Sequence, residues 1–516
     1  MKNKLSYLWA FLIAFTLPFT NRALADDTNA ITKTSFNAVT SQLDPGGDFY
    51  LYLSTARWLE HLNTYIESWR GKMMSLPNAK AEDLDNINKA FDLIGHLTAD
   101  SGIQDLDGVG ISSVEVEPGM YRTKGLLHHA AGAGTGFMWQ LGGAKPHALT
   151  GLNLLPANTA LAMFSDTDIP KIWSVVEDEA IRSGIPQAQE SVRQVPAQFE
   201  KATKIGWTAF LNSLGGEVGV CLTLDESNPV PIPLPSGLIN IPEPGLFIAL
   251  RVNDDTIFNR IAEEMKTNGQ TMVTEKTGLR MRTMPVPIPM AINLRPTEAS
   301  SGGYLFIASS DTLIQDVLAV RDGNIPGLKD TKEFKHISQN IPEQGNQFCF
   351  VSPVFGRTVA SIQEQVLSAK QAGNPAQTEW MRSLFNQQKP AYSYCVGANT
   401  PEGYLSVGNG SQSGSTVVLL PMVAVGGVMA AVAIPNFVKA RETAQRSACI
   451  NNLRQIDAAK SEWALENNKT NGVVPTEADL AQYIRNGMPK CPAGGTYTIG
   501  PIGEKPTCSL PGHVLR

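Results

Sequence analysis

The sequence predicts an α+β protein of repeated strand–helix sub-domains with mainly antiparallel sheets, followed by a long hydrophobic helix and a small α+β head. Three observations predict this class. Extended apolar runs recur between residues 31 and 405, and each passes directly into a helical pattern. An uncharged apolar segment covers residues 416–438. A second amphipathic helix and a short segment bracketed by cysteines complete the chain.

The amino terminus has the pattern of a secretory signal peptide over residues 1–25. Lys2 and Lys4 precede an apolar core, and Ala23-Leu24-Ala25 is a small-residue cleavage site. We expect cleavage after Ala25 and export of the chain; an uncleaved anchor is the alternative. No cysteine follows directly, so a lipid anchor is not expected.

Length and charge set limits on the function. A chain of 516 residues is too long for one core and predicts two to four domains. Residues 26–438 hold 41 acidic and 29 basic residues, a net charge of −12, which argues against nucleic acid as a partner. Six cysteines in a chain of this length do not form a disulfide scaffold.

The body repeats one local pattern, in which a strand ends in Ser or Asp and that residue caps the next helix. We expect sub-domains with a sheet and helices on one face, over residues 31–150 and residues 151–405, with a linker at 406–415. The predicted strand–helix units begin at Phe49, Thr159, Leu246, Tyr304 and Phe348, and further strands are predicted at Val109–Val116, Met120–His128 and Val218–Leu224. The helical stripes are Trp58, Leu62, Ile66 and Trp69, and Leu84, Ile87, Phe91 and Ile94.

A proline pattern occurs twice, at Pro229–Pro233 and Pro285–Pro289. Alternating prolines keep the chain extended and remove ladder donors. One interpretation is an apolar lip for a ligand or partner peptide, and the other is a pair of edge blockers or hairpin arms.

The body also resembles a family of secreted bacterial domains of unknown function. The similarity rests on Leu155-Pro156-Ala157-Asn158-Thr159 before a strand and on the segment 303–310, GYLFIASS, before a helix. This resemblance implies no activity.

The sequence contains no pattern typical of a catalytic site, cofactor site or metal site. His128 and His129 are adjacent, so they point to opposite faces of a strand, and we expect them to be solvated. The glycine-rich run at 131–136 lacks the Lys-Ser/Thr pair of a phosphate loop. We predict that the chain is not an enzyme and that its body cysteines are core residues: Cys221, Cys349 and Cys395.

The apolar segment has the length of a membrane span. Residues 417–434 form a nearly continuous apolar run, and a helix of that length rises about 27 Å, close to a bilayer core of about 30 Å. We expect a transmembrane helix at 416–438; a buried helix of a soluble domain is the alternative.

The apolar segment and the residues after it resemble type IV pilins and type II secretion pseudopilins. The similarity rests on the apolar helix with Ala433-Ile434-Pro435-Asn436-Phe437 near its end, and it covers about the last hundred residues. It implies a pseudopilin-like domain at 439–516, partners among pseudopilins or secretion-system proteins, and a disulfide between Cys491 and Cys508 that leaves Cys449 unpaired. The expected helical stripe is Cys449, Leu453, Ile456 and Trp463, with Asp457 and Lys460 on the polar side and a capping box at Thr476 and Asp479.

The chain departs from the pilin pattern at the processing site. Gly414 and Thr416 are retained, but no Glu occurs between Glu402 and Glu442. Ordinary processing and filament assembly are therefore not expected, and the segment is interpreted as a membrane anchor.

The expected topology contains a conflict. An exported body followed by a spanning helix places the tail in the cytoplasm, and Lys439, Arg441 and Arg446 agree with this orientation. A Cys491–Cys508 disulfide instead requires an oxidising compartment. The side on which the tail lies stays open.

These observations predict a non-enzymatic cell-envelope protein with a periplasmic body and an inner-membrane anchor at 416–438. It would associate with a type II secretion or type IV pilus-like system. The alternative is a periplasmic binding module for a hydrophobic ligand or partner peptide. We predict no cofactor and no nucleic-acid partner, and make no prediction of oligomeric state.

Overall fold

The computed structural model describes residues 31–75, 81–234, 237–266, 271–285, 293–369, 391–414, 446, 448–484 and 487–515. The predicted signal peptide with Ala25 and the predicted span at 416–438 lie outside these ranges. Across the ranges given, none of the helices combines the length and the apolar character that a bilayer crossing requires.

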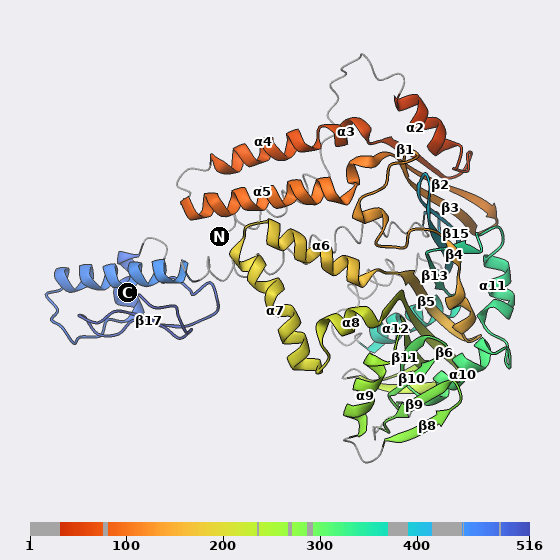
Figure 1. Ribbon diagram of the computed structural model, residues 1–516. Helices are drawn as coiled ribbons and strands as arrows, with labels where there is room; N and C mark the ends of the chain where they lie inside the picture. Colours follow the sequence, from red (N-terminus) through yellow and green to blue (C-terminus); the bar gives the residue numbers. More distant parts are fainter. Residues whose placement is uncertain are drawn as a thin grey trace.

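One antiparallel sheet of 13 described strands forms the centre of the body (Figure 1). Their order is β1-β2-β3-β15-β14-β13-β5-β6-β7-β11-β10-β9-β8. The α+β class with antiparallel pairing is confirmed. Residues 406–410 of the predicted linker at 406–415 belong to β15, so this half of the linker is a strand and not a linker. Because β15 pairs with both β3 and β14, the two predicted regions, 31–150 and 151–405, contribute strands to the same sheet. The strands are β1 Phe49–Ser54, β2 Leu106–Glu117, β3 Met120–His129, β5 Thr159–Asp166, β6 Leu214–Leu234, β7 Gly237–Val252, β8 Met272–Lys276, β9 Leu279–Thr283, β10 Thr297–Ser301, β11 Tyr304–Ala308, β13 Gln347–Val351, β14 Ser393–Thr400 and β15 Gly403–Gly410.

The described helices of the body lie between these strands in the sequence, except α2, which precedes β1. They are α2 Ile31–Thr40, α3 Ala56–Glu60, α4 Leu62–Met74, α5 Ala81–Ser101, α6 Ile169–Arg182, α7 Pro186–Thr203, α8 Trp207–Ser213, α9 Thr256–Lys266, α10 Asp311–Arg321, α11 Lys332–Ile337 and α12 Pro353–Ala369. Short 3-10 helices are η1 Ile103–Asp105, η2 Phe137–Trp139, η3 Thr150–Leu154 and η4 Leu328–Asp330, and β4 His147–Ala148 pairs with β12 Gln344–Gly345 outside the main sheet.

Each of the five predicted strand–helix units is present. Four of the helices begin where a polar side chain accepts a backbone N–H, as the capping argument requires. The side chain of Asp168 caps α6, that of Ser310 caps α10, and Ser352 accepts the N–H of Phe355 at the start of α12. Asp254 accepts the N–H of Thr256 at the start of α9, at 2.8 Å.

Helices cover both faces of the sheet, and not one face as expected. Strand β11 shows the reason, because Tyr304, Leu305 and Phe306 are all buried. Tyr304 and Phe306 pack in the core that includes α10 and α11, whereas Leu305 packs on the opposite face with α9. A strand that is apolar on both sides requires a helical layer on each. Figure 1 shows α4 to α9 on one side of the sheet and α11 on the other.

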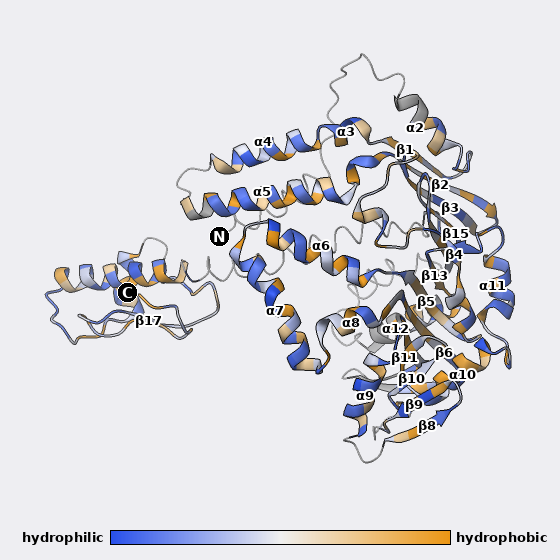
Figure 2. Ribbon diagram, viewed as in Figure 1, coloured by the Kyte–Doolittle hydropathy of each residue, from blue (hydrophilic) through white to orange (hydrophobic). Residues whose placement is uncertain are grey.

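The predicted stripe of Trp58, Leu62, Ile66 and Trp69 does not lie on one helix. The chain leaves α3 and enters α4 at His61, so the helical period is interrupted. Leu62 is buried, whereas Trp58 and Trp69 are 43% and 42% exposed. Figure 2 shows polar and apolar residues mixed along these helices.

Strands β6 and β7 continue past the sheet as a long two-stranded arm. Pro229 to Pro233, the first proline pattern, pairs with β7 from Pro242 to Leu238, and Val230 is buried. This segment is therefore a hairpin arm. Of the second pattern only Pro285 belongs to the described residues.

The tail forms a small α+β module (blue in Figure 1). A helix over residues 448–466 packs on α15 Glu477–Leu480, η5 Ala481–Tyr483 and the short hairpin of β16 Tyr497–Thr498 and β17 Thr507–Cys508. The predicted stripe of Cys449, Leu453, Ile456 and Trp463 is buried. The predicted capping box at Thr476 and Asp479 is present.

Lys460 does not lie on the polar surface as expected. It is 2% exposed, and its Nζ donates to the carbonyl oxygens of Ile499, Pro501 and Glu504 at 2.8, 2.9 and 2.8 Å. The burial lowers the pKa of Lys460, although Asp457 and Glu504 oppose this effect. One ammonium therefore fixes the loop between β16 and β17 to the helix.

We expect Lys460→Met to destabilise the tail by about 2 to 4 kcal/mol, because three carbonyl groups lose a charged donor. Hydrogen exchange of the amides between residues 497 and 508 measures the effect. Lys505→Met, an exposed lysine of the same loop, is the matched control and should change little. Equal protection in both variants would contradict the anchoring role.

Candidate functional site

Four potential ligand side chains meet in the tail. Cys449 comes from the helix, Cys491 from the loop before β16, Cys508 from β17 and His513 from the turn after it. One ligand atom from each lies within 4.8 Å of the others. Cys449 and Cys491 are buried, and Cys508 and His513 are half-buried. A set with this composition and spacing can hold a metal ion.

The predicted disulfide is not formed in this structure. Cys491 and Cys508 are neighbours, but both are free thiols, and their sulfurs lie 3.8 Å apart, compared with about 2.0 Å in a disulfide. Cys449, which the pilin resemblance leaves unpaired, joins them, as does His513. No pattern in the sequence predicts a role for His513, although it follows Cys508 by only five positions.

Hydrogen bonds to the sulfur atoms surround this cluster. Burial opposes ionisation of Cys491, but N–H groups of Ala493 and Gly495 donate to its sulfur, and the net effect lowers the pKa of Cys491. Burial raises the pKa of Cys449 to about 12, although a hydrogen bond with Tyr497 acts to lower it. Cys491 therefore ionises more readily than Cys449.

The backbone at Gly495 passes close to the cluster. A Cβ at this position would lie 2.8 Å from Sγ of Cys508 and 2.9 Å from Cγ of Leu510. Only glycine fits this approach without a shift of the cysteine.

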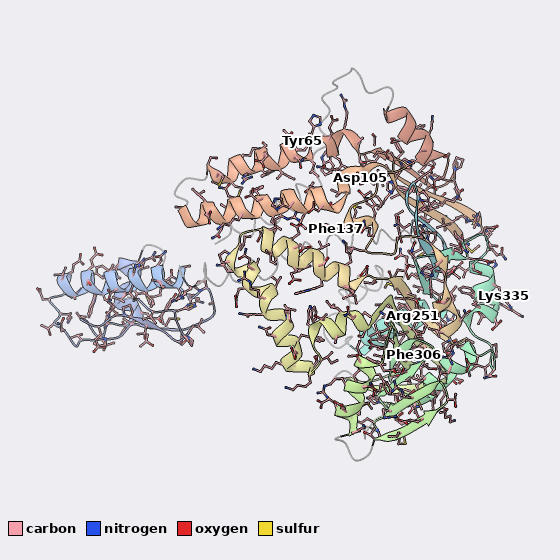
Figure 3. The ribbon with its side chains drawn as sticks, in the orientation of Figure 1. Tyr65, Asp105, Phe137, Arg251, Phe306 and Lys335 are labelled. Carbon is pink, nitrogen blue, oxygen red and sulfur yellow. The ribbon has the colours of Figure 1, made fainter. Side chains whose placement is uncertain are left out.

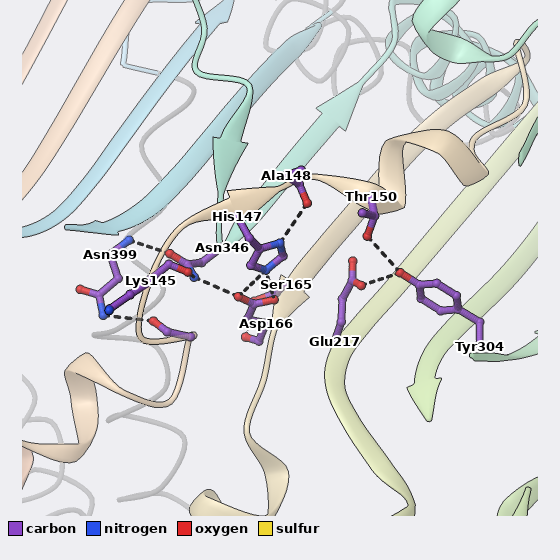
Figure 4. A network of polar contacts seen from close by, with 11 residues as sticks. Lys145, His147, Ala148, Thr150, Ser165, Asp166, Glu217, Tyr304, Asn346 and Asn399 are labelled. Carbon is purple, nitrogen blue, oxygen red and sulfur yellow. Dashed lines mark hydrogen bonds and ion pairs between the residues drawn. The ribbon is translucent and has the colours of Figure 1, made fainter. Parts of the chain in front are cut away.

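A polar network joins the loop before β4 to the centre of the sheet (Figure 4). Asp166, at the end of β5, accepts hydrogen bonds from His147 Nε2 and Asn346 Nδ2, both at 2.9 Å. Asn346 Oδ1 in turn accepts the N–H of Asn399 at 2.8 Å. Gly143 has a φ of +87°, and a Cβ there would lie 2.3 Å from Asp166 Oδ2. The network ties three separate segments together.

His147 and a neighbouring carboxyl have shifted pKa values. Burial opposes protonation of His147, but hydrogen bonds to Ala148 and Asp166 outweigh it and raise its pKa. Burial raises the pKa of Glu217, which accepts the hydroxyl of Tyr304 at 2.6 Å (Figure 4). Both groups are already bonded to protein partners, which suits a structural role.

An open cleft of about 470 Å³ lies between α5, η2 and α6, and it is lined mainly by polar residues. Asp105 and Phe137, labelled in Figure 3, contribute to its wall. Arg182 pairs with Asp100 at 2.6 Å and with Glu179 at 3.3 Å. Burial raises the pKa of Glu179 to about 7. The paired charges join α5 to α6.

His128 and His129 are buried, and not solvated as expected. They do point to opposite faces, as the strand geometry predicts. His128 Nδ1 lies 2.5 Å from Asp107 Oδ1, whereas His129 packs edge-on against Trp139 with ring centroids 4.6 Å apart. The burial of β3 on both faces explains the difference. Among the body cysteines, Cys221 and Cys395 are core residues as predicted, and Cys349 is partly exposed.

Glu298 on β10 is a buried carboxyl group without a hydrogen-bond partner. It is 2% exposed, and both of its oxygens are buried and unpaired among the described groups. Burial raises its pKa to about 8, although Arg282 and Arg280 oppose this effect. Glu298 is therefore mainly protonated at neutral pH.

No family model, curated protein sequence or solved structure matches this chain.

We expect folding stability to fall as the pH rises from about 4.5 to about 8, because folded Glu298 holds its proton over that interval and the unfolded chain releases it. Glu298→Gln should remove this loss of stability. The variant's gain in free energy of unfolding over the unaltered chain should therefore be larger at pH 8 than at pH 5 by more than about 1 kcal/mol. Denaturant unfolding at both pH values measures it. Glu263→Gln, on the exposed side of α9, is the control. An identical pH dependence in both variants would rule out this assignment.

Proposed function

We propose that this chain is a non-enzymatic cell-envelope protein. Its body is exported to the periplasm, the segment 416–438 anchors it in the inner membrane, and its tail is a pilin-like module. Components of a type II secretion or type IV pilus-like system are the proposed partners, through lateral packing of the apolar helix.

The observation that carries the proposal is the order of parts at the carboxyl end. An apolar segment of membrane-spanning length leads to an amphipathic helix, and the buried stripe of that helix packs on a short carboxyl-terminal hairpin. Type IV pilins and pseudopilins have the same order of parts. The acidic balance of residues 26–438 supports a role away from nucleic acid.

The contacts of the body support a non-catalytic role. In the polar cleft, Arg182 pairs with Asp100 of α5 and with Glu179 of its own helix, and in the network His147 of β4 bonds to Asp166 of β5. Pairing of this kind suits groups that stabilise the fold.

A second candidate is a binding module for an extended partner peptide, and strand β1 favours it. β1 is an edge strand whose residues Phe49, Tyr50, Leu51 and Leu53 are 45%, 41%, 40% and 37% exposed. Exposed apolar edge strands accept an additional strand from a partner. This candidate shares the proposed location and differs in what the body binds.

Membrane attachment tests the first proposal. The double variant Val425→Arg/Val428→Arg should leave the carbonate-washed membrane fraction, because each arginine at mid-span costs about 2.5 to 3.5 kcal/mol. Val425→Leu/Val428→Leu is the matched control and should stay in the membrane. Release of the unaltered chain by carbonate would overturn the proposed anchor.

Hydrogen exchange of β1 tests the second candidate. We expect the outward N–H groups of Phe49–Ser54 to exchange rapidly in the purified chain and to be protected when the chain is in its native envelope membranes. Equal exchange in both preparations argues against strand addition at β1.

A further inference from the structure

We propose that the tail binds one zinc ion through Cys449, Cys491, Cys508 and His513. The inference stands on the described geometry of the tail and does not depend on the proposed function. It assigns a structural Cys3His site that includes Cys491 and Cys508, the two residues for which the pilin resemblance implies a disulfide.

The distances fit a metal better than a bond between two sulfurs. A tetrahedral zinc ion with Zn–S bonds of about 2.3 Å places its ligand sulfurs about 3.8 Å apart. The sulfurs of Cys491 and Cys508 lie 3.8 Å apart. A disulfide would use only these two thiols and would leave Cys449 without a role. The cluster instead offers four donor atoms within 4.8 Å of one another, the number that zinc requires.

The donor types favour zinc. Thiolate-rich tetrahedral sites select zinc or iron–sulfur centres, and Cys3His with four protein ligands is typical of a closed structural zinc site. The Nδ1 atom of His513 is buried and has no hydrogen-bond partner among the described residues. A buried nitrogen without a partner is costly, and coordination would satisfy an imidazole nitrogen at this position.

The groups around the cluster match the outer shell of a metal site. N–H groups of Ala493 and Gly495 donate to the sulfur of Cys491. Tyr497 bonds to Cys449, and its hydroxyl accepts Nδ2 of Asn452 at 3.1 Å. Outer partners of this kind orient ligands and tune a bound metal. Gly495 also leaves the space that Cys508 needs.

A bound ion would join four separate segments of the module. The helix, the loop before β16, strand β17 and the final turn each supply one ligand. Strands β16 and β17 have two residues each, which is short for a stable hairpin. Binding releases the thiol protons to solvent, and the divalent charge offsets the repulsion among the thiolates.

Metal content of the full chain is the first test. The chain is solubilised in mild detergent, purified with reductant and analysed for zinc and iron; we expect about one zinc per chain. Replacement by Co²⁺ should give the visible absorption of tetrahedral cobalt–thiolate coordination. Alkylation of the thiols before lysis, followed by mass mapping, should show Cys491 and Cys508 reduced.

Two variants separate the metal site from the disulfide. Cys449→Ser removes one ligand and retains both disulfide partners, so only the metal hypothesis predicts an effect. His513→Gln removes a half-buried ligand at the edge of the module and keeps all three thiols. Loss of an outer partner lowers the metal affinity of a site by about 10- to 100-fold. We expect each of these two variants to lower the cobalt affinity by more than that. Cys349→Ser and His336→Gln, both in the body, are the matched controls and should bind cobalt as the unaltered chain does.

Three results would overturn the proposal. The first is a reduced full chain that contains no stoichiometric zinc and does not bind Co²⁺. The second is unchanged cobalt affinity in Cys449→Ser and His513→Gln. The third is a Cys491–Cys508 disulfide in protein alkylated before lysis.

Discussion

Strand β13 joins the two halves of the body. It pairs with β14 on one side and with β5 on the other, so the strands on the β1 side and on the β8 side form one sheet. Phe348 and Phe350 are buried on this strand, and the ring of Phe348 stacks on that of Phe164 at 5.1 Å. These two alternate residues lie on the same face of the sheet, so that face must be covered, and the connections must run outside the sheet. The network around Asp166 fastens one such connection where β5 ends.

Local signals in the sequence predicted the units of this fold but not their order. Apolar runs that end in a capping residue predicted the five strand–helix units, because strand pattern and cap are separated by only a few positions. The pairing of β15 with β3 joins residues far apart in sequence, and no local pattern encodes it. The burial of β11 on both faces corresponds to the continuous apolar run Tyr304–Ala308 in the sequence. The same kind of run is also typical of a half-covered strand or a short helix.

The candidate site was predicted only in part, for a similar reason. The pilin resemblance indicated that Cys491 and Cys508 are adjacent, and their thiols are adjacent. It left Cys449 unpaired, although the helix brings this residue to the cluster from 42 positions earlier, and it implied nothing for His513. Lys460 shows the same limit, because a charged residue at a polar helical spacing predicts a surface position. Only the loop of residues 499–504, folded back over the helix, buries its ammonium.

The proposed metal site bears on the side of the membrane on which the tail would lie. A Cys491–Cys508 disulfide requires an oxidising compartment, whereas an exported body followed by a spanning helix places the tail in the reducing cytoplasm. Zinc holds cysteines as thiolates, so a Cys3His site is stable where a disulfide is not. With zinc in the tail, the positive residues Lys439, Arg441 and Arg446 agree with a cytoplasmic position. The proposed anchor at 416–438 and a cytoplasmic tail are then compatible with each other. The pilin-like order of parts would serve a metal-stabilised cytoplasmic module joined through the membrane to an acidic periplasmic body.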